Sequence, residues 1–164
     1  VPAPVLRTIA EPPDDKARPS TPYHAKFSGP FTVATALIGG GGLGVYSNDF
    51  TDETLRDPER LRLAGIVRCV ADEEATSIFP YQFPAVLTVR LRDGSELSER
   101  ISHNRGGPDR PLSPEELATK FRLNAGHELP AEQVDVLEHA IWALDEEPSV
   151  SKMMELTHRS RRNS

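Results

Sequence analysis

Residues 85–101 read Ala-Val-Leu-Thr-Val-Arg-Leu-Arg-Asp-Gly-Ser-Glu-Leu-Ser-Glu-Arg-Ile, and this stretch predicts a β-hairpin. Apolar and polar side chains alternate along the predicted strands, 85–91 and 96–101, and Asp93-Gly94 between them favours a tight turn. One side of the sheet collects four apolar side chains, Leu87, Val89, Leu97 and Ile101. We expect this face to pack against a layer of helices, because such alternation is typical of a half-buried antiparallel sheet.

Helical patterns precede the hairpin. Ser28 is a suitable N-cap and Pro30 suits a first turn, so an apolar helix is predicted that ends at the glycines from Gly39 onward. Asp57-Pro58 opens a second helix. We also expect a strand at 1–6 and a short one at 68–71. Residues 11–22 hold four prolines and no apolar period, which predicts an exposed connector or a segment that lies over a partner.

Helical patterns also follow the hairpin. The run Ser113-Pro-Glu-Glu116 is a capping box that opens a helix. Two more helices are predicted at about 130–144 and 149–156. The order of elements therefore predicts an α+β fold, a small antiparallel sheet with packed helices, followed by a C-terminal helical pair.

Composition excludes several classes of function. Lys and Arg number 19 against 25 Asp and Glu, a net charge of -6, so we expect no nucleic-acid partner. The single cysteine, Cys69, excludes an internal disulfide and favours a reducing, cytoplasmic setting. No apolar stretch is long enough for a membrane span. The five histidines are scattered without metal-ligand spacing, so no metal site is expected.

A glycine-rich run, 39–44, suggests a phosphate-binding loop, but the pattern around it does not fit. Phosphate loops follow a strand and open a helix, whereas a predicted helix comes before these glycines. Helix termination is the better interpretation. Cys69 lies in an apolar segment, where a thiol is more often structural than reactive.

Two places could bind an anionic substrate. His24, Lys26 and Ser28 surround a predicted helix start, where unpaired N–H groups and the helix dipole favour a carboxylate. Arg105 lies on a loop after the hairpin and could clamp a carboxylate. The alternatives are that Ser28 only caps the helix, Lys26 is solvated, His24 packs on the connector and Arg105 is an ordinary surface arginine.

Several segments together resemble the C-terminal region of the MmgE/PrpD (2-methylcitrate dehydratase-like) family. They occur in the family's order: 25–38 followed by glycines, 49–53 with Asp57-Pro58, the hairpin from Pro84, the block 111–121, and 129–144. The joint order of these segments is specific, although no single one is diagnostic.

This resemblance implies a lid-type α+β domain that covers an active site on a large helical domain. Family members are cofactor-independent lyases and isomerases of small polycarboxylates, whose chemistry handles a proton α to a carboxylate. The resemblance divides the chain into an entering strand and connector (1–22), the lid domain (23–125), helices returning to the helical domain (126–157) and a flexible tail (158–164). The implied partners are that helical domain, as part of the protein or as a separate chain, and further copies in a homo-dimer or hetero-oligomer.

The chain departs from the family pattern at Phe31, which occupies the position of a family tyrosine. That tyrosine's hydroxyl is implied to act in the active site, so its absence puts proton transfer at this position in doubt. The family's upstream Lys- and His-bearing motif is not among the 164 residues, so we expect the chain alone to be inactive. An alternative is a non-catalytic binding or assembly module derived from the family. Another is an ordered piece of a longer chain.

Overall fold

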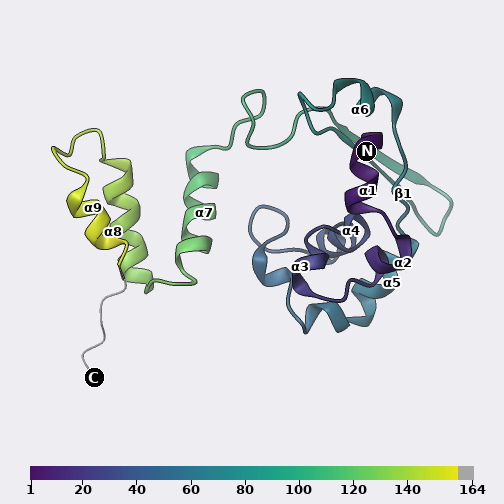
Figure 1. Cartoon of the computed structure of the whole chain (residues 1–164), viewed down its shortest axis with the longest axis horizontal. Coiled ribbons are helices and arrows are strands. Elements are labelled where there is room, and N and C mark those ends of the chain that lie inside the picture. The colour runs from purple at the N-terminus through teal and green to yellow at the C-terminus, as the bar shows by residue number, and fades with distance from the viewer. Residues whose placement is uncertain (159–164) are drawn as a thin grey trace. The chain divides into compact units, whose positions relative to one another are not determined.

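The computed structural model describes residues 1–158. These residues fall into two compact units, divided between Pro111 and Leu112, shown in Figure 1. The fold is α+β, with a two-stranded antiparallel sheet in the first unit and helices in both. The predicted fold class, including the C-terminal helical pair, is confirmed.

The first unit is built around α4 (Gly29–Ile38), which packs against α5 (Pro58–Ile66) and α2 (Pro13–Ala17). Its other helices are α1 (Leu6–Ile9), α3 (Pro22–Ala25) and α6 (Glu73–Ile78), and short 3-10 turns cover Ala3–Val5, Ser47–Asp49 and Thr54–Arg56. The core is small. Phe31, Ala34 and Ala64 have no exposed surface.

The start and end of α4 follow the sequence prediction. The Ser28 hydroxyl accepts a hydrogen bond from the backbone N–H of Phe31 at 3.0 Å, which satisfies one of the helix's unpaired donors. Gly39 ends the helix with φ 109°, a left-handed conformation that favours glycine. Asp57 likewise caps α5, with Pro58 at its first position.

Two predictions for residues before the hairpin are wrong. Residues 3–9 form a 3-10 turn and α1, where a strand was expected. Residues 68–71 form no strand. The Val1 ammonium donates to Val70 O at 3.0 Å and Asp72 N–H donates to Val1 O at 3.0 Å, and two such bonds do not make a strand pair. The connector at 11–22 is largely exposed and contains α2 and the buried Pro19.

The hairpin has the predicted strands and register. β1 (Ala85–Arg90) pairs with β2 (Glu96–Ile101), and Val89 lies opposite Leu97. The four apolar side chains therefore share a face, as predicted. The expected burial of that face is wrong: Leu87 is 42% and Leu97 is 62% exposed. The physical reason is that α2, α4 and α5 pack on one another.

The second unit consists of α7 (Pro114–Ala125), α8 (Ala131–Trp142) and α9 (Ser151–Leu156), in contact as α7 with α8 and α8 with α9. The predicted capping box is present, with Ser113 and Glu116 each bonded to the other's backbone N–H. Arg122 on α7 binds Glu138 on α8 through two hydrogen bonds, at 2.6 and 2.8 Å. Among its residues up to His158, the buried apolar ones are Ala118, Val134 and Leu137.

Within residues 1–158, no helix has both the length and the apolar character needed to cross a lipid bilayer. The predicted flexible tail, 158–164, lies outside the described residues except for His158.

Candidate functional site

The turn between α3 and α4 carries three of the predicted site residues. Thr21 caps α3 by accepting a hydrogen bond from His24 N–H at 3.1 Å, and Ser28 caps α4. The Ser28 hydroxyl is 1% exposed and also donates to the backbone oxygen of Lys16. Both hydrogen-bonding roles of Ser28 are therefore filled by the protein itself.

Lys16 ties α2 to this turn. Its ammonium donates to the backbone oxygens of Thr8, at 2.5 Å, and Phe27, at 2.9 Å. An ammonium has three donors, so one remains beyond these two. Lys16 thus holds the connector against the start of α4, and the Ser28 hydrogen bond to its carbonyl closes the same joint.

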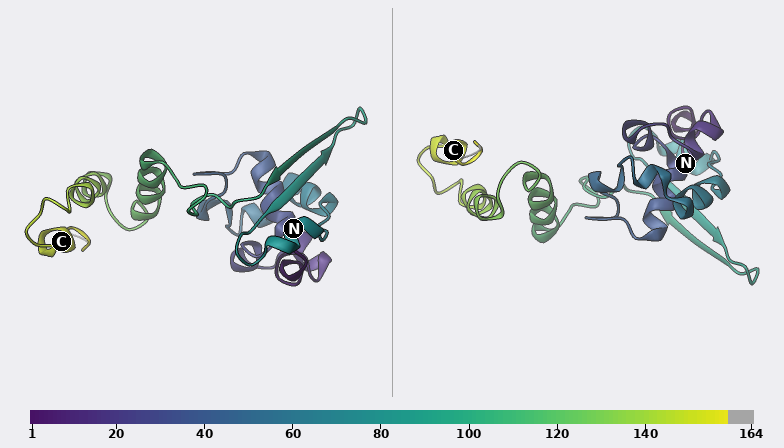
Figure 2. Two further views of the ribbon diagram at one scale, coloured as in Figure 1. Left: turned by 90° about the horizontal axis from the view of Figure 1, so that it is seen from above. Right: turned by 90° about the horizontal axis from the view of Figure 1, so that it is seen from below.

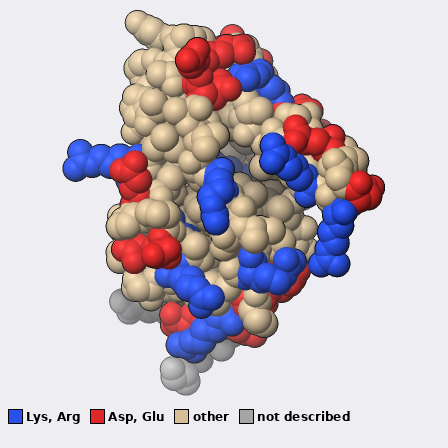
Figure 3. Space-filling model, turned by 90° about the vertical axis from the view of Figure 1, so that its right-hand side faces the viewer, with Lys and Arg blue, Asp and Glu red and all other residues tan. Residues whose placement is uncertain are grey.

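His24 lines a cavity of about 280 Å³ beside this joint. The walls carry basic and acidic groups in nearly equal number: Lys16, Arg18 and His24 against Glu11 and Asp15, with Ser20 between them. Ser20 Oγ lies 2.9 Å from His24 Nδ1 and orients the ring. Figure 3 shows one face of the molecule, on which basic and acidic side chains are interspersed.

The structure places the other two predicted residues away from this cavity's walls. Lys26 is exposed at the C-terminal end of α3, where its backbone N–H donates to Tyr23 O at 3.2 Å, and it does not line the cavity. Arg105 donates through Nη1 to the backbone oxygen of Leu43 at 3.0 Å, so it contacts the glycine-rich loop. Of the four predicted binding residues, His24 is the one that lines the cavity.

The glycine-rich loop binds a carboxylate of its own chain. Asp49 Oδ2 accepts hydrogen bonds from the backbone N–H groups of Gly41, at 2.8 Å, and Tyr46, at 2.7 Å. Arg60 lies 3.8 Å from the other Asp49 oxygen. The N–H groups that would cradle a phosphate in a nucleotide-binding loop here hold Asp49.

Phe31 is a core residue of this unit. Its side chain is fully buried, and its ring packs against Phe50 with centroids 6.2 Å apart. Cys69 is half-buried beside Gly29, and burial raises the pKa of its thiol. A raised pKa lowers the thiolate fraction, which is the reactive form. Among residues 1–158, no group of three or more His, Cys, Asp or Glu side chains is placed to hold a metal ion.

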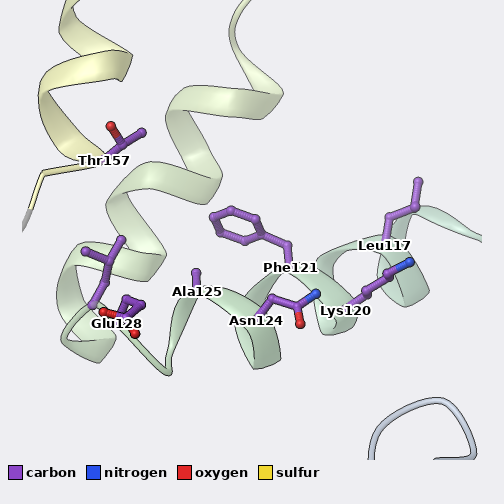
Figure 4. Close-up of a pocket in the computed structure, with 8 residues that line it drawn as sticks. Leu117, Lys120, Phe121, Asn124, Ala125, Glu128 and Thr157 are labelled. Carbon is purple, nitrogen blue, oxygen red and sulfur yellow. The ribbon is translucent and has the colours of Figure 1, made fainter. Parts of the chain in front are cut away.

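A second concavity, of about 890 Å³, lies wholly in the helical unit. Leu117, Phe121 and Ala125 follow one another at helical spacing along α7 and form its apolar side, shown in Figure 4. Lys120, Asn124 and Glu128 form a parallel polar row. The helical unit therefore has an open groove with an apolar row and a polar row of side chains.

Sequence reasoning missed Lys16, Asp49 and Arg60. Lys16 sits in a proline-rich segment without apolar period, where nothing local indicates a buried joint. Asp49 follows the glycine run by only a few residues, and that proximity is the signal that could have identified it.

Comparison with known protein families gives one match. The profile of the MmgE/PrpD C-terminal domain matches residues 1–146. Comparison with curated protein sequences gives no match. The family match covers the whole first unit together with α7 and α8, and α9 lies beyond it.

Proposed function

Because the chain belongs to the MmgE/PrpD family as its C-terminal domain, we propose that it is the lid portion of a lyase or isomerase of small polycarboxylates. The family match carries this proposal. A C-terminal domain implies a partner N-terminal domain. The proposed enzyme works without a cofactor in the cytoplasm, and this portion is inactive without the helical domain.

The exposed apolar surface of the helical unit supports a missing partner. Leu117, Phe121, Ala125 and Leu129 line one concavity of this unit, and Leu117 is 47% exposed. Large apolar side chains exposed together usually mark an interface. We propose that the helical domain, as part of the protein or as a separate chain, covers this surface.

The proposed role of the lid is to bind carboxylates. A proton α to a carboxylate is weakly acidic, so its removal needs cationic groups that stabilise the negative charge of the transition state. His24 and Lys26 are exposed and basic. Among the described residues His24 Nε2 makes no hydrogen bond, and Ser20 holds the opposite nitrogen. The helical domain would supply the acid and base that move the proton.

Reconstitution tests the proposal. We would mix the chain with an MmgE/PrpD-type helical domain and follow the dehydration, decarboxylation and epimerisation of tricarboxylates and dicarboxylates. We expect complex formation and turnover. His24→Gln and Lys26→Met should raise KM roughly 10- to 100-fold, since a hydrogen bond to a charged group contributes about 1.5–3 kcal/mol. Lys152→Met, on α9 and outside the lining of the groove in the helical unit, is the matched control. Failure of the chain to bind any such domain would refute the assignment.

A non-catalytic assembly module is the second candidate, and the burial of Phe31 favours it. The position of the family tyrosine carries a fully buried ring without a hydroxyl. This alternative predicts that the reconstituted complex forms but shows no turnover, and that Phe31→Tyr does not restore any.

A further inference from the structure

The β-hairpin has an open edge that a further strand could extend. Its sheet contains two strands, and two-stranded ribbons are marginally stable alone. Five of the six residues of β2 are exposed. Figure 2 shows the hairpin extending away from the helices of its own unit.

The register shows which backbone groups face outward. Leu91 N–H donates to Ser95 O at 2.8 Å, which makes this a hydrogen-bonded pair. Such pairs alternate in an antiparallel ladder, so Val89 with Leu97 and Leu87 with Glu99 are also hydrogen-bonded pairs. The N–H and C=O groups of Glu96, Ser98 and Arg100 therefore point away from β1. Within residues 1–158, no backbone group outside the hairpin bonds to these three residues.

We propose that β2 pairs antiparallel with β2 of a second copy of this chain, about a two-fold axis at Ser98. Outward-facing residues must pair with one another, which leaves few registers. Centring the axis on Glu96, Glu99 or Arg100 places like charges directly opposite each other, which is destabilising. Centring it on Leu97 leaves Arg100 unpaired. The Ser98 register pairs residues 96–100 and places Glu96 opposite Arg100 of the second copy twice.

Arg100 and Glu96 each keep a hydrogen-bonding atom available for this pairing. The Arg100 guanidinium binds Asp72 through Nη1 and Nη2, at 3.1 and 3.0 Å, and its Nη1 also lies 3.2 Å from Glu74 Oε2. Its Nε–H makes no hydrogen bond in the described part of the chain. Glu96 accepts from Arg90 Nε through Oε2, at 2.9 Å. Glu96 Oε1 takes no part in the hydrogen bonds of residues 1–158. The new pair would thus add to existing ion pairs without breaking them.

The pairing would also extend the apolar face. A two-fold axis perpendicular to the sheet leaves the same face upward in both copies, so Leu87, Val89 and Leu97 of each would lie on one four-stranded surface. This proposal is independent of the proposed function, because it depends only on the hairpin.

Cysteine cross-linking tests the edge and the register. In a Cys69→Ser background, Ser98→Cys places the two substituted positions opposite each other at about 5.5 Å between Cα atoms, within disulfide range. Thr88→Cys is the matched control, because Thr88 pairs with Ser98 across the hairpin but lies on the β1 edge. We expect S98C to form disulfide-linked dimers roughly tenfold faster or more than T88C, since pairing raises the effective concentration.

Sedimentation tests the charge pairing. We expect the full chain to dimerise reversibly and Glu96→Lys to weaken the dimer roughly tenfold, with an unchanged circular dichroism spectrum as the check on folding. Equal or faster cross-linking of T88C would overturn the choice of edge. A monomeric chain without S98C cross-linking, or an E96K dimer of unchanged affinity, would overturn the proposal. Protection of S98C by an added helical domain would assign the edge to that domain instead.

Discussion

Phe31→Tyr tests whether position 31 belongs to the core or to a solvent-accessible site. The Phe31 side chain is fully buried, so an added hydroxyl would enter the core without access to water. Thr35, one turn further along α4, is also fully buried, and its hydroxyl has no hydrogen-bond partner within the described residues. This part of the core therefore offers little compensation to a second hydroxyl.

The expected cost follows from that burial. Burying a hydroxyl without a partner costs about 1–3 kcal/mol. With a urea m-value of roughly 1–3 kcal/mol/M, a loss of about 2 kcal/mol lowers the unfolding midpoint by about 1 M. We would measure urea unfolding by far-ultraviolet circular dichroism and localise the effect by hydrogen exchange in α4.

Phe50→Tyr is the matched control. Phe50 packs on Phe31 but is only partly buried, so its added hydroxyl can reach water and should change the stability by less than about 0.5 kcal/mol. If Phe31→Tyr were as stable as the parent chain, the ring edge would have to reach solvent or a polar partner. The assignment of Phe31 to the core would then be refuted.

Three further perturbations test other parts of the structure. Arg122→Ala should lower the free energy of unfolding by about 2 kcal/mol, and Glu138→Gln by about 1 kcal/mol. Arg122→Ala leaves the Glu138 carboxylate, which is 10% exposed, without its counterion, whereas Arg122 itself is 56% exposed and can be solvated. Unfolding followed by the fluorescence of Trp142 on α8 measures both changes. The Arg100 guanidinium lowers the pKa of Asp72 from its ordinary 3.8 to about 2. The ionised Asp72 carboxylate therefore stabilises the fold above about pH 4, and this contribution is lost as the pH falls through about 2. Asp72→Asn should make the Tm less dependent on pH in that range. Gly40→Ala would place a methyl group 2.2 Å from the backbone oxygen of Gly44, so it should displace the glycine-rich loop and speed hydrogen exchange there. Gly65→Ala is the control, because its methyl group would meet no atom within 4 Å and exchange should not change.

Local signals in the sequence predicted where the longer helices and the hairpin strands begin. The caps at Ser28, Asp57 and Ser113 each start a helix as expected, because their side chains bond backbone groups two or three residues away. The tight turn that Gly94 allows, with φ 87°, likewise sets the hairpin register locally. These interactions need no knowledge of the rest of the fold.

The candidate site was only partly predictable. Sequence reasoning identified His24 as a binding residue and recognised that Ser28 could be a cap. It did not place Lys16 beside them, because the two carbonyls that bind its ammonium belong to other segments. Such long-range partners follow from packing, which local propensity does not encode.

The sequence by itself determined the longer helices, the hairpin, its apolar face and the family, because these depend on short-range patterns and on their order along the chain. Tertiary structure alone decided what covers each surface. It buries Phe31, engages the glycine-rich loop with Asp49 and leaves the hairpin face open. The physical reason is that burial depends on how the elements are assembled. The same alternating pattern is found in a strand that packs on a core and in a strand whose apolar face is exposed.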